Sequence, residues 1–149
     1  MFHRPLIACL CASLLAATPL RAQESPVALR GEVHVVRVVD GVETRQPPEQ
    51  VVPGDKLVFS THYRNTQAVA VDGFVVTNPL PAQVMLAADG PFEVSVDGGT
   101  EFGPLASRTL TENGAVRPAT LADVSHVRWT VARLEPGAEG ELSYFATVR

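Results

Sequence analysis

The chain has 149 residues, with 12 basic and 16 acidic side chains and a formal net charge of −4 at pH 7. This length fits one domain with a full core, and the acidic balance argues against a nucleic-acid partner, because phosphate binding needs a basic surface. Both cysteines, Cys9 and Cys11, lie close to the N-terminus, which excludes a disulfide-stapled scaffold for the remainder of the chain.

Residues 1–22 are predicted to be a signal peptide. A short polar start is followed by an apolar run over residues 6–17 and by Ala22, a small residue suited to cleavage. The run is shorter than the roughly twenty residues that a membrane-spanning helix needs, so no membrane span is expected. Cleavage would remove two basic residues and no acidic one, which leaves ten against sixteen and a formal charge of −6. We therefore expect an exported protein, periplasmic or secreted.

Residues 23–30 are predicted to be a flexible leader, because they contain Ser25-Pro26 and show no periodic pattern. A single domain is predicted over residues 31–149. Its first strand, at residues 32–38, has an alternating pattern and ends at the Asp40-Gly41 turn.

Proline and glycine residues mark the start of the second predicted strand. The prolines at 47–48 remove two ladder donors, and Pro53-Gly54-Asp55 turns the chain. Residues 56–65 then alternate, with Leu57 and Phe59 on one face. We expect that face to meet the core.

A third strand is predicted at residues 69–78. Asp72-Gly73 interrupts its pattern and predicts a kink or a bulge. Two short strands follow it, at residues 84–86 and 92–96.

The next stretch of the chain is rich in turn signals. Asp97-Gly98-Gly99 is predicted to close a hairpin into a strand at residues 100–102, because glycine tolerates a positive φ. Glu112-Asn113-Gly114 predicts a loop tip. Residues 120–125 are expected to form at most a short helical turn, with Thr120 as its cap.

Two alternating strands are predicted to close the domain, one around Trp129 and one at residues 142–148, on either side of a Glu135-Pro136-Gly137 turn. Seven to nine short strands joined by such turns favour an all-β fold, an immunoglobulin-like antiparallel β-sandwich, with a barrel as the alternative. Trp129 is expected to be the largest side chain of the core, lying between the sheets.

No metal site is predicted. The histidines of the predicted mature chain, His34, His62 and His126, lie on three separate strands, and none has a neighbour at metal-ligand spacing. Asp97 and Glu101 place two carboxylates close together. Their spacing is sparser than that of a calcium loop, which favours an ordinary turn over a calcium site.

Signatures of catalysis are also missing, so no catalytic or cofactor-binding residue is predicted. The sequence has no Gly-x-Ser-x-Gly elbow, no glycine-rich loop leading into a helix, and no cysteine after the predicted cleavage site. Glu135, Glu139 and Glu141 bracket the last turn, and paired carboxylates can serve glycoside hydrolysis. Edge strands carry such charges to resist aggregation, which is the interpretation that we favour.

Six short motifs follow one another along the chain. They are Val52-Pro53-Gly54-Asp55, Tyr63-Arg64-Asn65-Thr66, Val75-Val76-Thr77-Asn78-Pro79-Leu80-Pro81, Val94-Ser95-Val96-Asp97-Gly98-Gly99, Val127-Arg128-Trp129 and Glu135-Pro136-Gly137-Ala138-Glu139-Gly140. Together they resemble a bacterial and archaeal envelope repeat, the domain of unknown function eleven. The resemblance covers about residues 32–148 and implies an immunoglobulin-like sandwich in exported proteins, often repeated in tandem, with no assigned catalytic residues. A single copy without a visible anchor favours a soluble periplasmic or secreted unit over a cell-surface stalk.

The favoured function is a noncatalytic structural or protein-interaction module of the cell envelope. Its partner is expected to be another envelope or secreted protein that pairs with an exposed edge strand or contacts a loop face. The edge candidates are the predicted first strand, residues 32–38, and the predicted last strand, residues 142–148.

Two other functions remain open from the sequence. One is self-assembly, in which residues 23–29 of one copy add a strand to the next copy and build a filament. The other is an enzyme or carbohydrate-binding domain that uses the acidic loops. This last function would need a cleft holding carboxylates of raised pKa.

Overall fold

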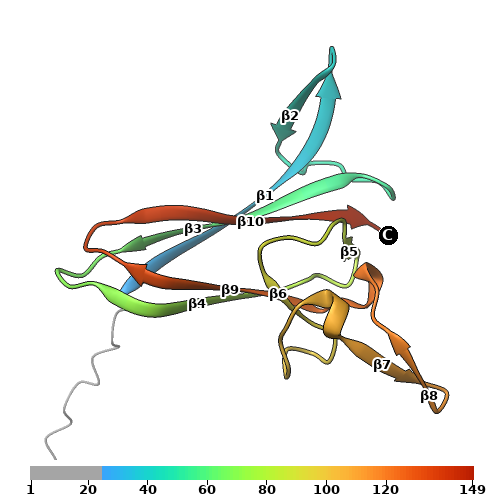
Figure 1. Ribbon diagram of the computed structural model, residues 1–149. Coiled ribbons are helices and arrows are strands. Elements are labelled where there is room, and N and C mark those ends of the chain that lie inside the picture. Colours follow the sequence, from blue (N-terminus) through green and yellow to red (C-terminus); the bar gives the residue numbers. More distant parts are fainter. Residues whose placement is uncertain (1–24) are drawn as a thin grey trace, which may run out of the picture.

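The computed structural model describes residues 25–149, so the predicted signal peptide and the first residues of the predicted leader lie outside the described part. Two antiparallel sheets pack against each other in this range (Figure 1). No helix in it is long and apolar enough to cross a membrane. The predicted fold class, an all-β immunoglobulin-like antiparallel β-sandwich, is confirmed.

The larger sheet has the strand order β2-β1-β3-β10-β5, and the smaller one has the order β4-β9-β6. A separate hairpin pairs β7 with β8, flanked by the short 3₁₀ helices η1 and η2. Residues 25–149 thus hold ten strands, where seven to nine were expected. The elements are β1 (Val27–Val39), β2 (Val42–Gln46), β3 (Lys56–Asn65), β4 (Val71–Pro79), β5 (Val84–Leu86), β6 (Glu93–Ser95), η1 (Leu105–Ser107), β7 (Thr109–Glu112), β8 (Ala115–Pro118), η2 (Leu121–Asp123), β9 (His126–Leu134) and β10 (Glu139–Val148).

Aromatic rings fill the space between the two sheets. Trp129 is 6% exposed, which confirms its predicted place in the core, and Phe92 meets its ring edge-on with centroids 5.5 Å apart. Phe59 of β3 stacks on Tyr144 of β10, with centroids 5.0 Å apart and planes 3° from parallel. Leu57 is buried as well, so the predicted core face of β3 is confirmed.

The start of β1 corrects the predicted domain boundary. The strand begins at Val27, so residues 27–30 belong to the sheet and are not a flexible leader. Each of them pairs with β3, from Val27 opposite Asn65 to Arg30 opposite His62. Burial gives the physical reason, because the side chain of Val27 is only 1% exposed and extends the apolar face of the strand.

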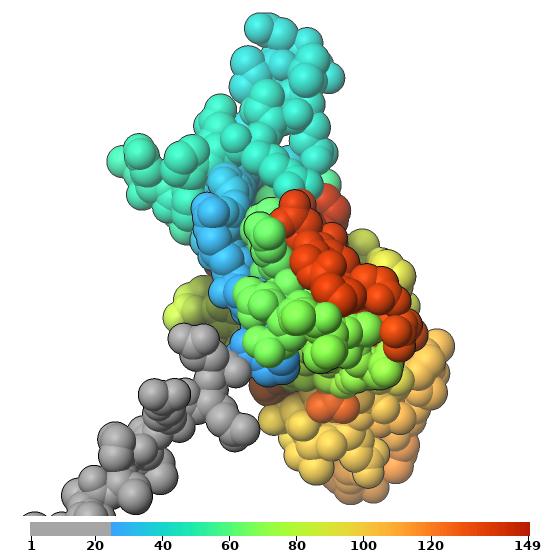
Figure 2. All heavy atoms as spheres, turned by 90° about the vertical axis from the view of Figure 1, so that its left-hand side faces the viewer, coloured from blue at the N-terminus to red at the C-terminus, as the bar shows by residue number. Residues whose placement is uncertain are grey.

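At its other end, β1 leaves the body of the sandwich. It forms a hairpin with β2 that projects beyond the other strands of the larger sheet and beyond the smaller sheet (Figures 1 and 2). The predicted Asp40-Gly41 turn closes this hairpin with positive φ at both residues, as a type I′ turn requires. Arg37 fastens the hairpin to the following loop through Asp55, with Nη2 2.9 Å from Oδ2.

The predicted hairpin after β6 forms only in part. Val94 and Gly103 make a single bridge, and residues 100–102 are not a strand. The Asp97 carboxylate accepts hydrogen bonds from the main-chain N–H groups of Thr100 and Glu101, at 3.0 and 3.1 Å. These donors face the turn and are not available to a ladder.

The interruption in β4 is a kink without a bulge. Gly73 has a φ of +61°, a conformation that favours glycine. Asp72 pairs with Arg133 before it and Phe74 with Val131 after it, so the register against β9 is unchanged. No extra residue is inserted, which distinguishes this kink from a bulge.

Two smaller predictions concern the region between β6 and β9. Thr120 is the N-cap residue of η2, and the Asp123 carboxylate accepts hydrogen bonds from its main-chain N–H and its hydroxyl, both at 2.8 Å. This confirms the short helical turn, although the helix has only three residues. The predicted loop tip at Asn113-Gly114 joins β7 to β8, with positive φ at both residues.

The last two strands, β9 and β10, follow each other in the sequence but lie in different sheets. β9 pairs with β4 and β6, whereas β10 pairs with β3 and β5. The turn at residues 135–138 therefore crosses from one sheet to the other. Asn65 holds it in place, since its N–H donates to the Ala138 carbonyl at 2.9 Å and its carbonyl accepts from Gly137 at 3.1 Å.

Candidate functional site

The predicted edge at residues 32–38 is open only in part. β2 pairs with β1 from Val35 to Val39 and covers one side of that segment. β3 pairs with the opposite side of β1, from Val27 to Val36. Among the described residues, no strand pairs with the outer side of residues 27–34. We call this segment the open edge of β1, and Figure 2 shows the blue strand along one side of the molecule.

The predicted edge at residues 142–148 lies mostly inside its sheet. β10 runs between β3 and β5, and β5 pairs with its last part, from Ala146 to Val148. Ala87 also donates its N–H to the Phe145 carbonyl at 2.9 Å. Within residues 25–149, only the segment 139–144 of β10 has no partner strand on that side.

The main-chain groups along the open edge of β1 alternate in direction. Thr66 donates its N–H to the Pro26 carbonyl at 3.1 Å, which directs the even-numbered residues of β1 toward β3. The N–H and C=O groups of Leu29, Gly31 and Val33 therefore point away from β3, and the described chain offers them no strand to pair with. This row of groups can accept an extended backbone.

A groove of about 340 Å³ lies beside this edge, and we call it the Gly31 groove. The ring contact between Tyr63 and Phe74, at 6.2 Å, places β4 opposite β3. β4 is the last strand of the smaller sheet, so in the described chain that sheet has no further strand opposite β1. The groove is lined by Gly31, Glu32, Val33, Phe59, Ser60, Thr61, Asn78, Pro79 and Tyr144.

The walls of the Gly31 groove are mostly apolar. The stacked Phe59 and Tyr144 rings form part of its lining, and burial raises the pKa of the Tyr144 hydroxyl to about 12. Asn78 donates its side-chain amide to the Thr61 hydroxyl at 2.8 Å, which links the two sheets at this point. Because these polar groups already bond to each other, the groove favours apolar contacts.

Charges flank the edge on the face that points away from the smaller sheet. Glu32 pairs with Arg30 and lies 3.7 Å from the Nε2 atom of His62. Glu141 accepts a hydrogen bond from the Ser60 hydroxyl at 2.6 Å, and this bond lowers the pKa of its carboxyl. The charges here are balanced and largely paired.

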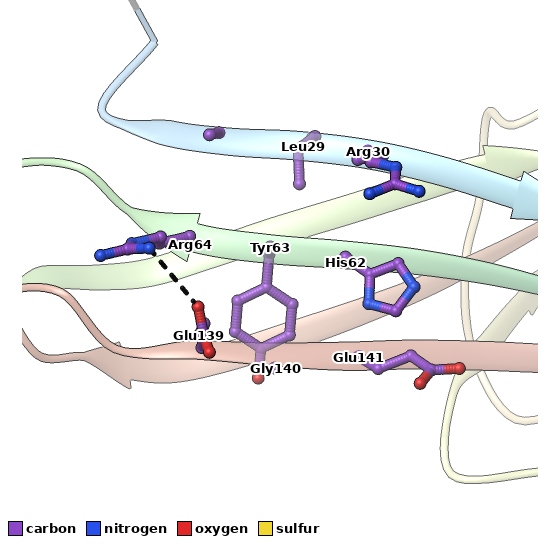
Figure 3. A pocket seen from close by; sticks show the side chains of 9 residues that line it. Leu29, Arg30, His62, Tyr63, Arg64, Glu139, Gly140 and Glu141 are labelled. Carbon is purple, nitrogen blue, oxygen red and sulfur yellow. Dashed lines mark ion pairs between the residues drawn. The ribbon is translucent and has the colours of Figure 1, made fainter.

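A larger groove of about 660 Å³ extends over β1, β3 and β10 (Figure 3). Figure 3 shows Tyr63 reaching from β3 to Gly140 on β10, where any side chain larger than glycine would overlap its hydroxyl. Arg64 and Glu139 form an ion pair across the groove at 3.8 Å. Both side chains are exposed, and such pairs contribute little to binding or stability.

Each of the acidic residues near the last turn lies close to an arginine. Glu135 pairs with Arg133 at 2.6 Å and Glu139 with Arg64. Hydrolysis of a glycoside needs one carboxyl of raised pKa, whereas the pKa of Glu141 is lowered. These contacts fit the interpretation of charged edge and loop residues.

The other candidate ligands are also placed apart or already bonded. His34, His62 and His126 lie on β1, β3 and β9. In residues 25–149 no group of three or more histidine, cysteine or acidic side chains could hold a metal ion. Hydrogen bonds from Ser95, Glu101 and Thr100 lower the pKa of Asp97, whose carboxylate stabilises the turn.

No family model matches the chain, and neither a curated protein nor a solved structure matches it. The resemblance to the envelope repeat therefore stays a prediction. The candidate site depends on geometry alone.

Sequence reasoning missed the Gly31 groove and the first residues of the open edge. Val27, Leu29, Val33 and Val35 continue one alternating apolar face, with Gly31 in its middle. That pattern was a usable signal for a longer strand. The groove itself depends on which strands face each other, and a local pattern does not contain that information.

Proposed function

We propose that this protein is a noncatalytic, exported interaction module of the cell envelope that binds an extended segment of another envelope protein at the open edge of β1. One observation carries the proposal. The main-chain groups of Leu29, Gly31 and Val33 form a row without a strand partner in the described chain. Edge pairing of this kind is a common mode of peptide recognition, because main-chain hydrogen bonds supply affinity.

The edge lacks most of the features that block such pairing. Natural edges are shortened, bulged or interrupted by proline, or carry inward-pointing charges. The open edge of β1 spans residues 27–34 with an unbroken register against β3, and its only proline, Pro26, precedes it. Arg30 and Glu32 are charged, but they project from the outer face and pair with each other.

Self-assembly through residues 23–29 has less support. Val27, Ala28 and Leu29 already pair with β3 of their own chain. Donating them to another copy would break that ladder and expose the buried Val27 side chain. The contacts between subunits of a filament would therefore have to contribute more free energy than the loss of this ladder and of the Val27 burial costs.

Site-specific photocrosslinking in the cell tests the proposal. A photoreactive residue at Leu29, which is 53% exposed, is expected to trap one envelope protein reproducibly. The matched control is Val116 of the β7–β8 hairpin, which is 70% exposed and lies away from the edge. Equal products from both positions, or none from Leu29, would overturn the proposal.

A further inference from the structure

We infer that the Gly31 groove is a side-chain pocket that selects a partner segment with a large apolar residue opposite Gly31. This inference rests on the proposed function, because it names which extended segment the open edge of β1 prefers. Along an added strand, main-chain bonds provide affinity and pockets for alternate side chains provide specificity.

Neither the backbone conformation nor a close neighbour requires a glycine at position 31. Its φ lies outside the left-handed region, so a side chain would not be strained there. Apart from Gly31 and its two chain neighbours, no heavy atom of the described residues lies within 4 Å of the position that a Cβ atom would occupy. At Gly140, by contrast, the Tyr63 hydroxyl explains the glycine, and nothing comparable explains Gly31.

Because side chains alternate between the two faces of β1, the space at Gly31 lies on the face toward the smaller sheet. Val27 and Val35 lie on the same face of the strand as Gly31 and are buried in the sandwich. Leu29 also shares this face but is 53% exposed, which shows that the smaller sheet does not cover this part of β1. The opening therefore lies between the sheets, at the mouth of the Gly31 groove.

An added strand would place a side chain at this mouth. Residues directly opposite each other on neighbouring strands have Cβ atoms about 4.5–5.5 Å apart and project to the same face. The partner residue facing Gly31 would thus point between the sheets, toward Val33 and Phe59. The row of main-chain groups without a strand partner in residues 25–149 favours an extended polypeptide, because a second backbone repeats N–H and C=O groups at the same strand spacing and a sugar or a lipid does not.

The chemistry of the groove selects an apolar side chain. Val33, Phe59, Pro79 and Tyr144 contribute to its lining. One side-chain N–H of Asn78 bonds to the Thr61 hydroxyl, and Glu32, the charged residue of the lining, already pairs with Arg30. A charged partner residue would therefore lose its hydration without an unpaired counter-charge in the lining. Leucine, isoleucine, methionine and phenylalanine are therefore the expected occupants.

Selection from a displayed library of short randomised peptides tests the inference on the purified protein. Wild type is expected to enrich sequences with one of those four residues at a fixed position in an alternating pattern. Gly31→Val fills the groove while keeping the edge N–H and C=O groups, so the enriched peptides should bind it at least about tenfold more weakly. Arg30→Val adds the same side chain on the outer face of the same edge and should bind as wild type does.

The possible failures are distinguishable. If the enriched peptides bind Gly31→Val and wild type equally, or show no apolar preference, the pocket is overturned while edge pairing stands. If wild type enriches no peptide, the proposed function fails, and the pocket fails with it. Loss of binding in Arg30→Val as well would also overturn the pocket, because filling the groove would then not be the cause.

Discussion

The side-chain amide of Asn65 donates a hydrogen bond to the main-chain carbonyl of Leu134 at 3.0 Å, which ties the end of β3 in one sheet to the end of β9 in the other. The same amide donates to Val69 at 2.8 Å, and its oxygen accepts from Gln67 at 2.9 Å. The residue is 1% exposed. Because both ends of the side chain are bonded, this buried polar group stabilises the fold.

Replacing Asn65 by alanine should lower the free energy of unfolding by about 1–3 kcal/mol, because the Leu134 carbonyl would stay buried without its donor. Urea unfolding measures this change, with an unchanged m-value as the sign of a native-like fold. Thr66→Ala is the control, since its hydroxyl makes only a 3.3 Å exposed bond to Pro26. Equal effects of the two changes would contradict the structural role of Asn65.

Trp129→Ala should cost roughly 3–5 kcal/mol of unfolding free energy, because the indole fills the space between the sheets beside Phe92 and Tyr144. Val116→Ala, at a residue 70% exposed, should change it by less than about 0.5 kcal/mol. Chemical denaturation provides both values. In native wild type, acrylamide should quench the tryptophan fluorescence poorly, and efficient quenching would show that the indole is not buried.

Stability should fall at low pH partly through Asp123. Hydrogen bonds from Arg117, at 2.8 and 2.9 Å, hold the pKa of this carboxyl well below its usual range. The stabilisation is therefore present above the unfolded-state pKa, near ~4, and is lost as the pH falls toward the folded value. Asp123→Asn should be less stable than wild type at neutral pH and approach it in strong acid. Unfolding curves across this range would contradict the ion pair if the difference stayed constant.

Stability should also fall at high pH, through Tyr144. Burial raises its pKa to about 12, whereas in the unfolded chain it ionises near ~10. The unfolded state loses its proton first, so the free energy of unfolding decreases as the pH rises between these values. Absorbance of the ionised phenol should show Tyr144 titrating above its usual range. Tyr144→Phe should remove this part of the alkaline decrease, and an unchanged pH profile would count against the burial.

Local patterns predicted the strands well wherever one face is buried and turn residues are explicit. β3 and the Asp40-Gly41 turn are examples, because alternation and positive φ are properties of a few neighbouring residues. The early start of β1 was not predicted from the sequence, because Ser25-Pro26 indicates a loop and Gly31 interrupts the apolar face. The pairing of Val27 with Asn65 is a long-range contact that the flanking residues do not encode.

The extent of the open edge escaped prediction for a related reason, although residues 32–34 belong to a predicted edge. Whether a strand lies at an edge depends on the sheet order, and β10 looks terminal in sequence although it lies between β3 and β5. The crossing of β9 and β10 between the sheets depends on the buried contacts of Asn65. The Gly31 groove depends in turn on the unequal widths of the two sheets, which sequence alternation does not specify.

In the part of the chain that the structure describes, β1 between residues 27 and 34 presents unpaired main-chain groups on alternate residues. Amide hydrogen exchange of the purified protein, resolved by residue, measures this directly. The N–H groups of Leu29, Gly31 and Val33 should exchange rapidly, while those of Ala28, Arg30 and Glu32, directed toward β3, should be protected. Equal protection of both sets would contradict the claim, because it would show that this edge is already covered.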